Sequence, residues 1–355
     1  MAEPTPTLPT PPFHVIPSIA NLRDAAASLG TPSLPLRSGL LFRSGDVSKL
    51  SASGWSALHA LNIRHIFDLR SLPEVGFAPR GRTPAASTNN TNNSDDVPAP
   101  PGPGPEPEPE PQPQPEPAWI TAMHAAGITR TWAPVFTQAD YSPEGIAKRY
   151  VKYMDEDAAA GFVSVYRDIL RSGAGAYAAI ARYMVGHPGA GVLVHCSAGK
   201  DRTGVFFAVL FAFLGVPDAR IADEYQLTEL GLAEIRADVV QRLLGSSAFR
   251  AYMLSKREGR ELSAGEMAEL FRDEKEGKSG SRGGGPGDGD TEFDEHVLRQ
   301  GREAALRMVS ARKETMMATL EMLRDEFGGA EKYLTDTCGL TADELKKLRE
   351  NLVRS

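Results

Sequence analysis

The sequence predicts an α/β protein, with a central and mainly parallel sheet flanked by helices and a helical C-terminal extension. Short apolar strands alternate with helical stretches between residues 40 and 214. Such an alternation is typical of parallel strands joined by helical crossovers. An apolar strand at 191–195 leads through a short turn into a strongly apolar helix. Beyond Gly215 the pattern is helical nearly to the end of the chain, notably at 293–327 and 341–354.

The expected elements can be placed one after another along this first part of the chain. Strands are expected at 40–43, 63–69, 128–136 and 191–195. Helices are expected at 51–61, from 142 through 171, at 174–185 and at 203–214. Ser51 or Ser53 caps the first of these helices, because a serine hydroxyl accepts a bond from the unpaired amides of the first turn. Pro143 suits the first position of the next helix, where no amide hydrogen is needed.

We expect one ordered domain, residues 13–355, with three disordered segments in or before it. Residues 1–12 are rich in proline and threonine, and residues 78–118 combine an asparagine run with a proline-glutamate alternation. Residues 277–290 form a glycine-rich linker. None of these compositions can bury an apolar core, and the prolines favour an extended, hydrated chain.

Charge and cysteine content exclude several classes of protein. The 355 residues carry a formal net charge of −7 without a strongly basic run, so no nucleic-acid partner is expected. The two cysteines, Cys196 and Cys338, make no disulfide framework and favour a cytoplasmic or nuclear compartment. The N-terminus lacks the pattern of a signal peptide. The longest apolar run, 205–216, is shorter than the roughly 20 residues of a membrane-spanning helix.

The segment that carries chemistry is the turn between the strand 191–195 and the helix after it, His195-Cys-Ser-Ala-Gly-Lys-Asp-Arg-Thr-Gly204. A helix start offers unpaired amides and the positive end of the helix dipole, and together they bind anions. Gly199 allows the turn to aim successive amides inward. The backbone of Ser197, Ala198 and Gly199 is therefore expected to hold a phosphate.

Two side chains of this turn indicate phosphate transfer. The planar fork of Arg202 grips two phosphate oxygens. The positive field favours the thiolate form of Cys196, which attacks the bound phosphate and forms a phosphocysteine. A nucleotide-binding Walker loop is excluded, since it would need a glycine where Val194 stands and a hydroxyl residue where Asp201 stands. No pattern has the spacing of metal ligands, so neither a metal nor a cofactor is expected.

With its preceding histidine and its Arg-Thr-Gly end, this loop resembles that of the protein tyrosine phosphatase superfamily. More narrowly, it is similar to the tyrosine/serine phosphatase family, which includes the broad-specificity mycobacterial and listerial phosphatases. Further resemblance lies at Asn21-Leu-Arg-Asp24, Leu41-Phe-Arg-Ser-Gly-Asp46, Ile66-Phe-Asp-Leu-Arg-Ser71 and Phe327-Gly-Gly-Ala-Glu-Lys-Tyr333. Segments 78–118 and 277–290 depart from the family as insertions, and three alanines follow Asp24 where relatives usually have glycines. The resemblance implies the cysteine-phosphatase fold.

Neighbouring side chains are assigned roles around the nucleophile. His195 is expected to orient the loop by hydrogen bonding, or to be structural. Thr203 offers its hydroxyl to the thiolate, or satisfies backbone groups at the helix start. Lys200 adds charge at the mouth of the pocket, which favours multiply anionic substrates such as inositol phospholipid head groups, or it is simply solvated.

A general acid must protonate the leaving oxygen, and two carboxylates compete for that role. Asp201 lies inside the loop beside Arg202, and the family resemblance implies this aspartate. Asp140 follows the expected strand 128–136, on a loop that could close over the pocket. Arg43, Asp68 and Arg70 lie at strand ends and either face the same crevice or form a buried ion-pair network under the loop.

The sequence therefore predicts a protein phosphatase that hydrolyses phosphotyrosine, and also phosphoserine or phosphothreonine, without stable membrane insertion. A phosphoinositide phosphatase with the same mechanism is one alternative. A phosphate-binding module without turnover is the other, although such a module would typically lose Cys196 or Arg202, and both are present. The partner is in each case a phosphorylated protein or a phosphoinositide.

Overall fold

The computed structural model describes residues 7–31, 34–75, 116–137, 140, 143–154, 158–260, 262–263, 266, 270 and 295–354. Three segments were expected to be disordered. Of these, 277–290, nearly all of 78–118 and the first half of 1–12 lie outside the described residues.

A sheet of five strands organises the described chain, in the order β1-β2-β5-β3-β4. The strands are β1 (Arg23–Asp24), β2 (Leu41–Ser44), β3 (Ile63–Asp68), β4 (Thr129–Trp132) and β5 (Gly191–His195). β1 runs antiparallel to β2, and all other neighbours pair in parallel. The central strand β5 is buried along its whole length, as expected for an apolar strand covered on both faces. The predicted mainly parallel α/β sheet is confirmed.

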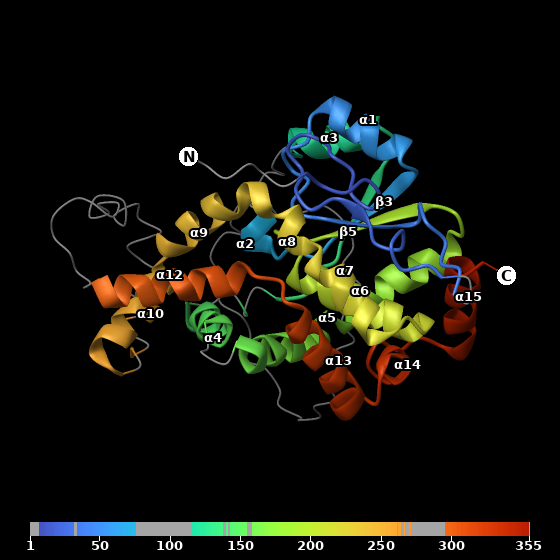
Figure 1. Ribbon diagram of the computed structural model, residues 1–355. Helices are drawn as coiled ribbons and strands as arrows, with labels where there is room; N and C mark the ends of the chain where they lie inside the picture. The colour runs from blue at the N-terminus through green and yellow to red at the C-terminus, as the bar shows by residue number, and fades with distance from the viewer. Residues whose placement is uncertain are drawn as a thin grey trace, which may run out of the picture.

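Helices cover both faces of the sheet (Figure 1). On one face lie α1 (Ala52–Ala60) and α3 (Ala118–Ala125), which bury residues such as Trp55 against one set of strand side chains. On the other lie α5 (Ala158–Gly186) and α6 (Asp201–Leu214). Strand side chains alternate between the two faces, so that Phe42, Ile66 and Leu193 pack in one cluster and Leu41, Phe67 and Val194 in the other.

Local signals account for several element boundaries. Ser51, and not Ser53, caps α1, with its hydroxyl accepting from the amide of Gly54 at 3.2 Å. β4 ends at Trp132, earlier than expected, although the amides of Ala133 and Val135 still donate to the carbonyl oxygens of Asp68 and Leu69. β1 was not predicted, since two residues are too few to give a pattern.

Two helices extend beyond their predicted bounds. α6 begins at Asp201, two residues before the expected start. α5 is a single helix where two were expected, and it continues through Gly173. A Cβ at Gly173 would stand 3.4 Å from the methyl groups of Val135, so glycine allows the helix to lie close to the chain that follows β4. Tertiary packing here outweighs the low helix propensity of glycine.

The C-terminal helices belong to the main core. α13 (Lys313–Phe327) packs on α5 and on α7 (Asp218–Gln226), and α15 (Ala342–Leu352) packs on α5. Between them lie α14 (Ala330–Lys332) and a π-helical turn, Tyr333–Thr337. Residues from this stretch join the same apolar cluster as the sheet, among them Met316, Leu320, Tyr333, Leu345 and Leu348. The predicted helical extension is confirmed, and it completes one face of the fold.

A second group of helices has an apolar cluster of its own. It comprises α4 (Pro143–Tyr153), α9 (Arg236–Leu244), α10 (Ser247–Glu258) and α12 (Glu295–Val309), which pack on one another and lie together at the left of Figure 1. Short turns, α8 (Thr228–Gly231), Ala233–Ile235 and the four-residue α2 (Leu72–Val75), complete the named elements. We call α4, α9, α10 and α12 the outer helices. They bury Phe249, Met253 and Ala304 away from the main core.

We predict that Leu348→Ala lowers the free energy of unfolding by about 2–5 kcal/mol, because Leu348 is fully buried in the main core. Urea unfolding followed by circular dichroism measures the change. Leu298→Ala, at a leucine that is 39% exposed, is the matched control and should change stability by less than about 0.5 kcal/mol. Equal small effects for both variants would place α15 outside the cooperative core.

Candidate active site

The carboxyl ends of four strands meet beside the cysteine loop. Sheet register places Ser44, His195, Asp68 and Trp132 side by side at the ends of β2, β5, β3 and β4. The loop from Cys196 to Lys200 leaves β5 at this edge and enters α6 at Asp201. The chain therefore turns where ligands bind in open α/β sheets, against the positive end of a helix.

The loop conformation depends on a glycine. Gly199 has φ +64°, a conformation that side-chain-bearing residues rarely adopt. A Cβ at this position would lie 2.1 Å from the carbonyl oxygen of Ser44. Only glycine allows the loop to pass this close to the end of β2.

Loop carbonyls are held on the outside of the turn by three donors. The Asp46 amide donates to the Ser197 oxygen at 3.0 Å, and Asn21 Nδ2 donates to the oxygens of Ala198 and Gly199 at 3.1 and 3.2 Å. An Arg43 guanidinium nitrogen also donates to the Gly199 oxygen, at 2.8 Å. Because the carbonyls face outward, the amides of the loop are directed inward, where an anion would sit.

A buried ion cluster backs this arrangement. Glu224 accepts from Arg23 at 2.7 Å and from Arg43 at 2.6 Å, and all three side chains are at most 2% exposed. Burial lowers the pKa of Arg23 to about 10, although the charge of Glu224 opposes that shift. Two arginines face one carboxylate, so the cluster carries net positive charge directly behind the loop.

Arg70 and Asp68, expected at strand ends, form a second buried network. Asp68 accepts from Arg70 at 2.9 and 3.0 Å and from Arg130 at 2.8 Å, while Arg70 also pairs with Asp46 at 2.7 Å. Burial alone would raise the pKa of the Asp68 carboxyl, but His195 and the arginines hold it well below its usual range. Arg130 was not identified from the sequence, and only its position in β4 beside β3 could have indicated it.

His195 lies between this network and the nucleophile. Its Nδ1 is 3.2 Å from the carbonyl oxygen of Cys196, and its Nε2 is 3.6 Å from an oxygen of Asp68. Burial, opposed by the nearby Asp68, lowers the pKa of His195. Through its contacts with Cys196 and Asp68 the ring can orient the loop.

The nucleophile lies at the base of the loop. Cys196 is only 2% exposed. In the first turn of α6, the hydroxyl of Thr203 is buried without a hydrogen-bond partner among the described residues. An unpaired buried hydroxyl is costly unless a ligand or a changed ionisation state supplies its partner.

Arg202 makes a two-pronged ion pair with a residue that the sequence did not single out. Its two terminal nitrogens contact the Glu74 carboxylate at 2.6 and 2.7 Å, and the Ser197 hydroxyl donates to the same carboxylate at 2.5 Å. Burial would raise the pKa of Glu74, but the charge of Arg202 and these bonds hold it well below its usual range. The spacing Ser71-x-x-Glu74, typical of a helix start, was the one signal for it.

Lys200, which we expected at the mouth of the pocket, is engaged with the end of α12. Its ammonium group donates to the carbonyl oxygens of Met308 at 2.5 Å and Ser310 at 3.1 Å, at the end of α12. It also lies 3.3 Å from Asp201 and 4.7 Å from the ring centre of Phe162, and the side chain is 4% exposed. Carbonyl oxygens and aromatic faces attract this cation inward, which a sequence pattern cannot reveal.

Asp201 and Asp140, the two acid candidates, lie in different surroundings. Asp201 is the first residue of α6, is 22% exposed, and accepts from the Tyr166 hydroxyl at 2.8 Å. Asp140 lies between β4 and α4, and its carboxylate accepts from the amide and hydroxyl of Thr137 at 2.7 and 2.8 Å. The Tyr166 hydroxyl also lies 2.6 Å from that of Tyr225. Asp201 thus directly follows the cysteine loop at the start of α6, whereas the Asp140 carboxylate stabilises the turn that begins at Thr137.

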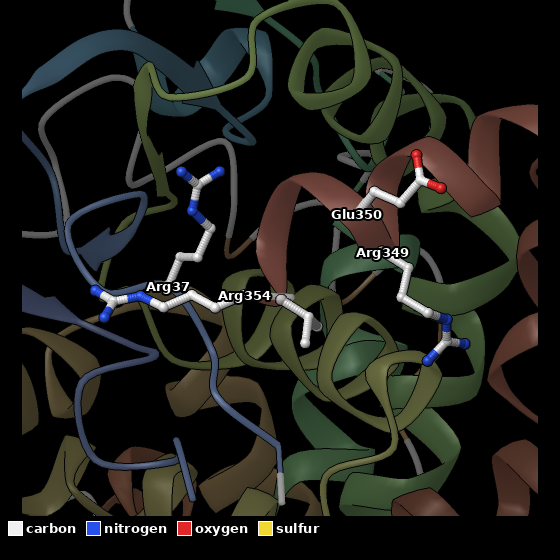
Figure 2. Close-up of a pocket in the computed structure, with 5 residues that line it drawn as sticks. Arg37, Arg349, Glu350 and Arg354 are labelled. Atoms are coloured by element: carbon white, nitrogen blue, oxygen red, sulfur yellow. The ribbon is translucent and has the colours of Figure 1, made fainter. Parts of the chain in front are cut away.

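The arginine-lined cavity of Figure 2 lies away from this loop. Its volume is about 540 Å³, and Arg37, Arg349 and Arg354 line it. Arg349 donates to the carbonyl oxygens of Phe213 and Leu214, at the far end of α6 from the cysteine. In Figure 2 the three guanidinium groups point in different directions, so they do not converge on one anion.

The parts of the chain that the structure describes contain no group of three or more histidine, cysteine, aspartate or glutamate side chains placed to hold a metal ion. No helix among them is long and apolar enough to cross a membrane.

Comparison with known proteins agrees with the geometry of the loop. A model of a tyrosine phosphatase family matches residues 14–354. The triple specificity protein phosphatase PtpB of Mycobacterium tuberculosis is 27% identical over 233 residues, which cover 64% of this chain and 73% of that protein.

We predict that Lys200→Met lowers the free energy of unfolding by about 1–3 kcal/mol, because it leaves two partly buried carbonyl oxygens without their donor. It should change the affinity for inorganic phosphate by less than about threefold, since the ammonium is engaged with α12. Urea unfolding and calorimetric titration measure the two effects, with Lys313→Met at an exposed lysine as control. A large loss of phosphate affinity at unchanged stability would place the ammonium at the phosphate.

Proposed function

Because the chain belongs to the tyrosine phosphatase family, we propose that it hydrolyses phosphotyrosine in proteins through a phosphocysteine on Cys196. The observation that carries this proposal is the loop between β5 and α6. Its carbonyls are tied outward by Asn21 and Arg43, and it joins Cys196 to Arg202. Such a loop presents amides, a guanidinium and a thiolate to one phosphoryl group.

In the first step the Cys196 thiolate attacks the phosphorus in line with the leaving oxygen. A bond from sulfur to phosphorus forms, the ester bond breaks, and the leaving oxygen takes a proton from a carboxylic acid. Arg202 and the inward amides stabilise the charge on the phosphoryl oxygens in the transition state. In the second step water attacks the phosphorus and gives a proton to the carboxylate, the bond to sulfur breaks, and inorganic phosphate leaves. We expect the Thr203 hydroxyl, which has no hydrogen-bond partner among the described residues, to donate to the returning thiolate.

We assign the acid role to Asp201. Its carboxylate is next to Arg202 in the chain and accepts a bond from Tyr166, while the carboxylate of Asp140 is engaged in its own turn with Thr137. A tyrosine leaving group, whose pKa is about 10, needs such a proton donor, and a serine alkoxide needs it more.

A protein substrate is better supported than a lipid head group. The phosphoinositide alternative depends on the charge of Lys200 facing a second phosphate, and that ammonium donates to Met308 and Ser310. The binding-module alternative would require the loss of a catalytic group, and both Cys196 and Arg202 are present. Because the name of PtpB states a triple specificity, the test includes the other substrate classes considered for this chain, phosphoserine and phosphoinositide, beside phosphotyrosine.

We predict that the protein releases phosphate from a phosphotyrosine peptide faster than from a phosphoserine peptide or a soluble phosphoinositide. Cys196→Ser should abolish release from all three, because serine at this position is a far weaker nucleophile. Phosphate release under initial-rate conditions measures this. Preference for the phosphoinositide would favour the lipid alternative, and no release by the unmodified protein would favour the binding module.

We further predict that Asp201→Asn lowers kcat by about 10²–10⁴-fold with an alkyl phosphate, and by less with p-nitrophenyl phosphate, whose leaving group needs little protonation. An acid acts only while it holds its proton, so the substitution should also flatten the alkaline limb of the pH–rate profile. Asp140→Asn is the matched comparison and should keep that limb. The reverse result would transfer the acid role to Asp140.

A further inference from the structure

The terminal nitrogens of Arg202 and the hydroxyl of Ser197 are engaged by a carboxylate of the protein itself. Both terminal nitrogens of Arg202 contact the two oxygens of Glu74, at 2.6 and 2.7 Å, and Ser197 donates its hydroxyl to one of those oxygens at 2.5 Å. Arg202 and Ser197 belong to the segment that should receive the phosphoryl group. We propose that the Glu74 carboxylate is a built-in ligand of the phosphate site, which the phosphoryl group of the substrate displaces.

The chemistry of the two anions makes them competitors. A carboxylate presents two oxygens in one plane, and a phosphoryl group presents two of its oxygens to a guanidinium fork in the same way. While the two terminal nitrogens of Arg202 are engaged by the Glu74 carboxylate, a phosphoryl group cannot bind to the same pair of nitrogens. The same holds for the Ser197 hydroxyl, which has a single hydrogen to donate.

Glu74 is held in place mainly by polar contacts. It lies on α2, a four-residue helix of which no residue is buried. Besides Arg202 and Ser197, its carboxylate accepts from the amide and hydroxyl of Ser71, at 3.1 and 2.6 Å. A helix without buried apolar side chains moves at low free-energy cost, so displacement of Glu74 need not disturb the core.

The rest of the site is anchored firmly by comparison. Ser71 follows Arg70, which is 3% exposed and pairs with both Asp68 and Asp46. The site is also largely closed while Glu74 is in place, with the side chain of Arg202 12% exposed and Cys196 2% exposed. When a phosphoryl group displaces Glu74, we therefore expect α2 to move while Arg70 stays in place. This movement would make Arg202 and Cys196 more accessible.

This inference rests on the proposed function, and binding of inorganic phosphate tests it without turnover. The full-length Cys196→Ser protein is titrated with phosphate by calorimetry, alone and combined with Glu74→Gln. If the carboxylate occupies the fork nine-tenths of the time, the apparent affinity is reduced about tenfold. Glu74→Gln should then bind phosphate about tenfold more tightly. Unchanged or weaker binding would overturn the proposal and make Glu74 a group that positions Arg202.

Matched variants separate this effect from others. Glu326→Gln removes the same charge from an exposed glutamate paired with Arg167, and it should leave phosphate affinity unchanged. An equal gain there would mean a general charge effect and overturn the proposal. Ser71→Ala removes one donor from Glu74 but no part of the loop. It should also tighten phosphate binding, by a smaller factor, and it answers the question if Glu74→Gln does not fold.

The outcome is independent of whether the proposed reaction takes place. A protein that releases no phosphate from any ester, yet binds phosphate more tightly after Glu74→Gln, would refute the enzyme mechanism and keep the built-in ligand. A protein that hydrolyses phosphotyrosine, yet binds phosphate no more tightly after Glu74→Gln, would keep the mechanism and refute the built-in ligand.

Discussion

Hydrogen bonds that hold the carbonyls of residues 197–199 on the outside of the cysteine loop are the constraint on which the rest of the site depends. Asn21 and Arg43 supply most of them, from chain segments more than 150 positions away in the sequence. If these carbonyls turned inward, they would repel a phosphate. The loop amides and Arg202 can act on an anion only because the backbone is fixed in this direction.

This constraint explains why so much charge is buried close to the loop. Arg43, which donates to the Gly199 oxygen, lies beside Arg23. The Glu224 carboxylate pairs with both arginines and neutralises part of their positive charge. On the other side of β5, Asp68 gathers Arg70 and Arg130 beneath His195. Breaking one partner of such a cluster leaves an uncompensated buried charge, so each member stabilises the others. The positive charge that an acidic protein needs for phosphate binding is therefore concentrated at one edge of its sheet.

The outer helices are tied to the same loop. Lys200 connects it to the end of α12, and Asp201 connects it through Tyr166 to α5. Glu74 contacts it from α2 on a further side. Residues 196–202 are thus in contact with α2, α5 and the end of α12, and movements of α2 or α12 act directly on the groups that would meet the phosphate.

The α/β class, the parallel sheet and the position of the chemistry could all be predicted from the sequence. Each depends on a local pattern, such as the apolar run of β5, the glycine at 199 or the spacing from Cys196 to Arg202. Local patterns report the conformation of neighbouring residues, and for that reason β2, β3, β5 and the helices between them lie near their expected places.

Which distant groups meet could be seen only in the folded protein. Folding engaged Lys200 with α12, placed Glu74 on Arg202, brought Arg130 to Asp68, and carried α5 through Gly173. These outcomes depend on contacts between segments that are far apart in the chain. The direction of a long charged side chain is set by whichever acceptors surround it after folding, and no spacing in the sequence encodes them.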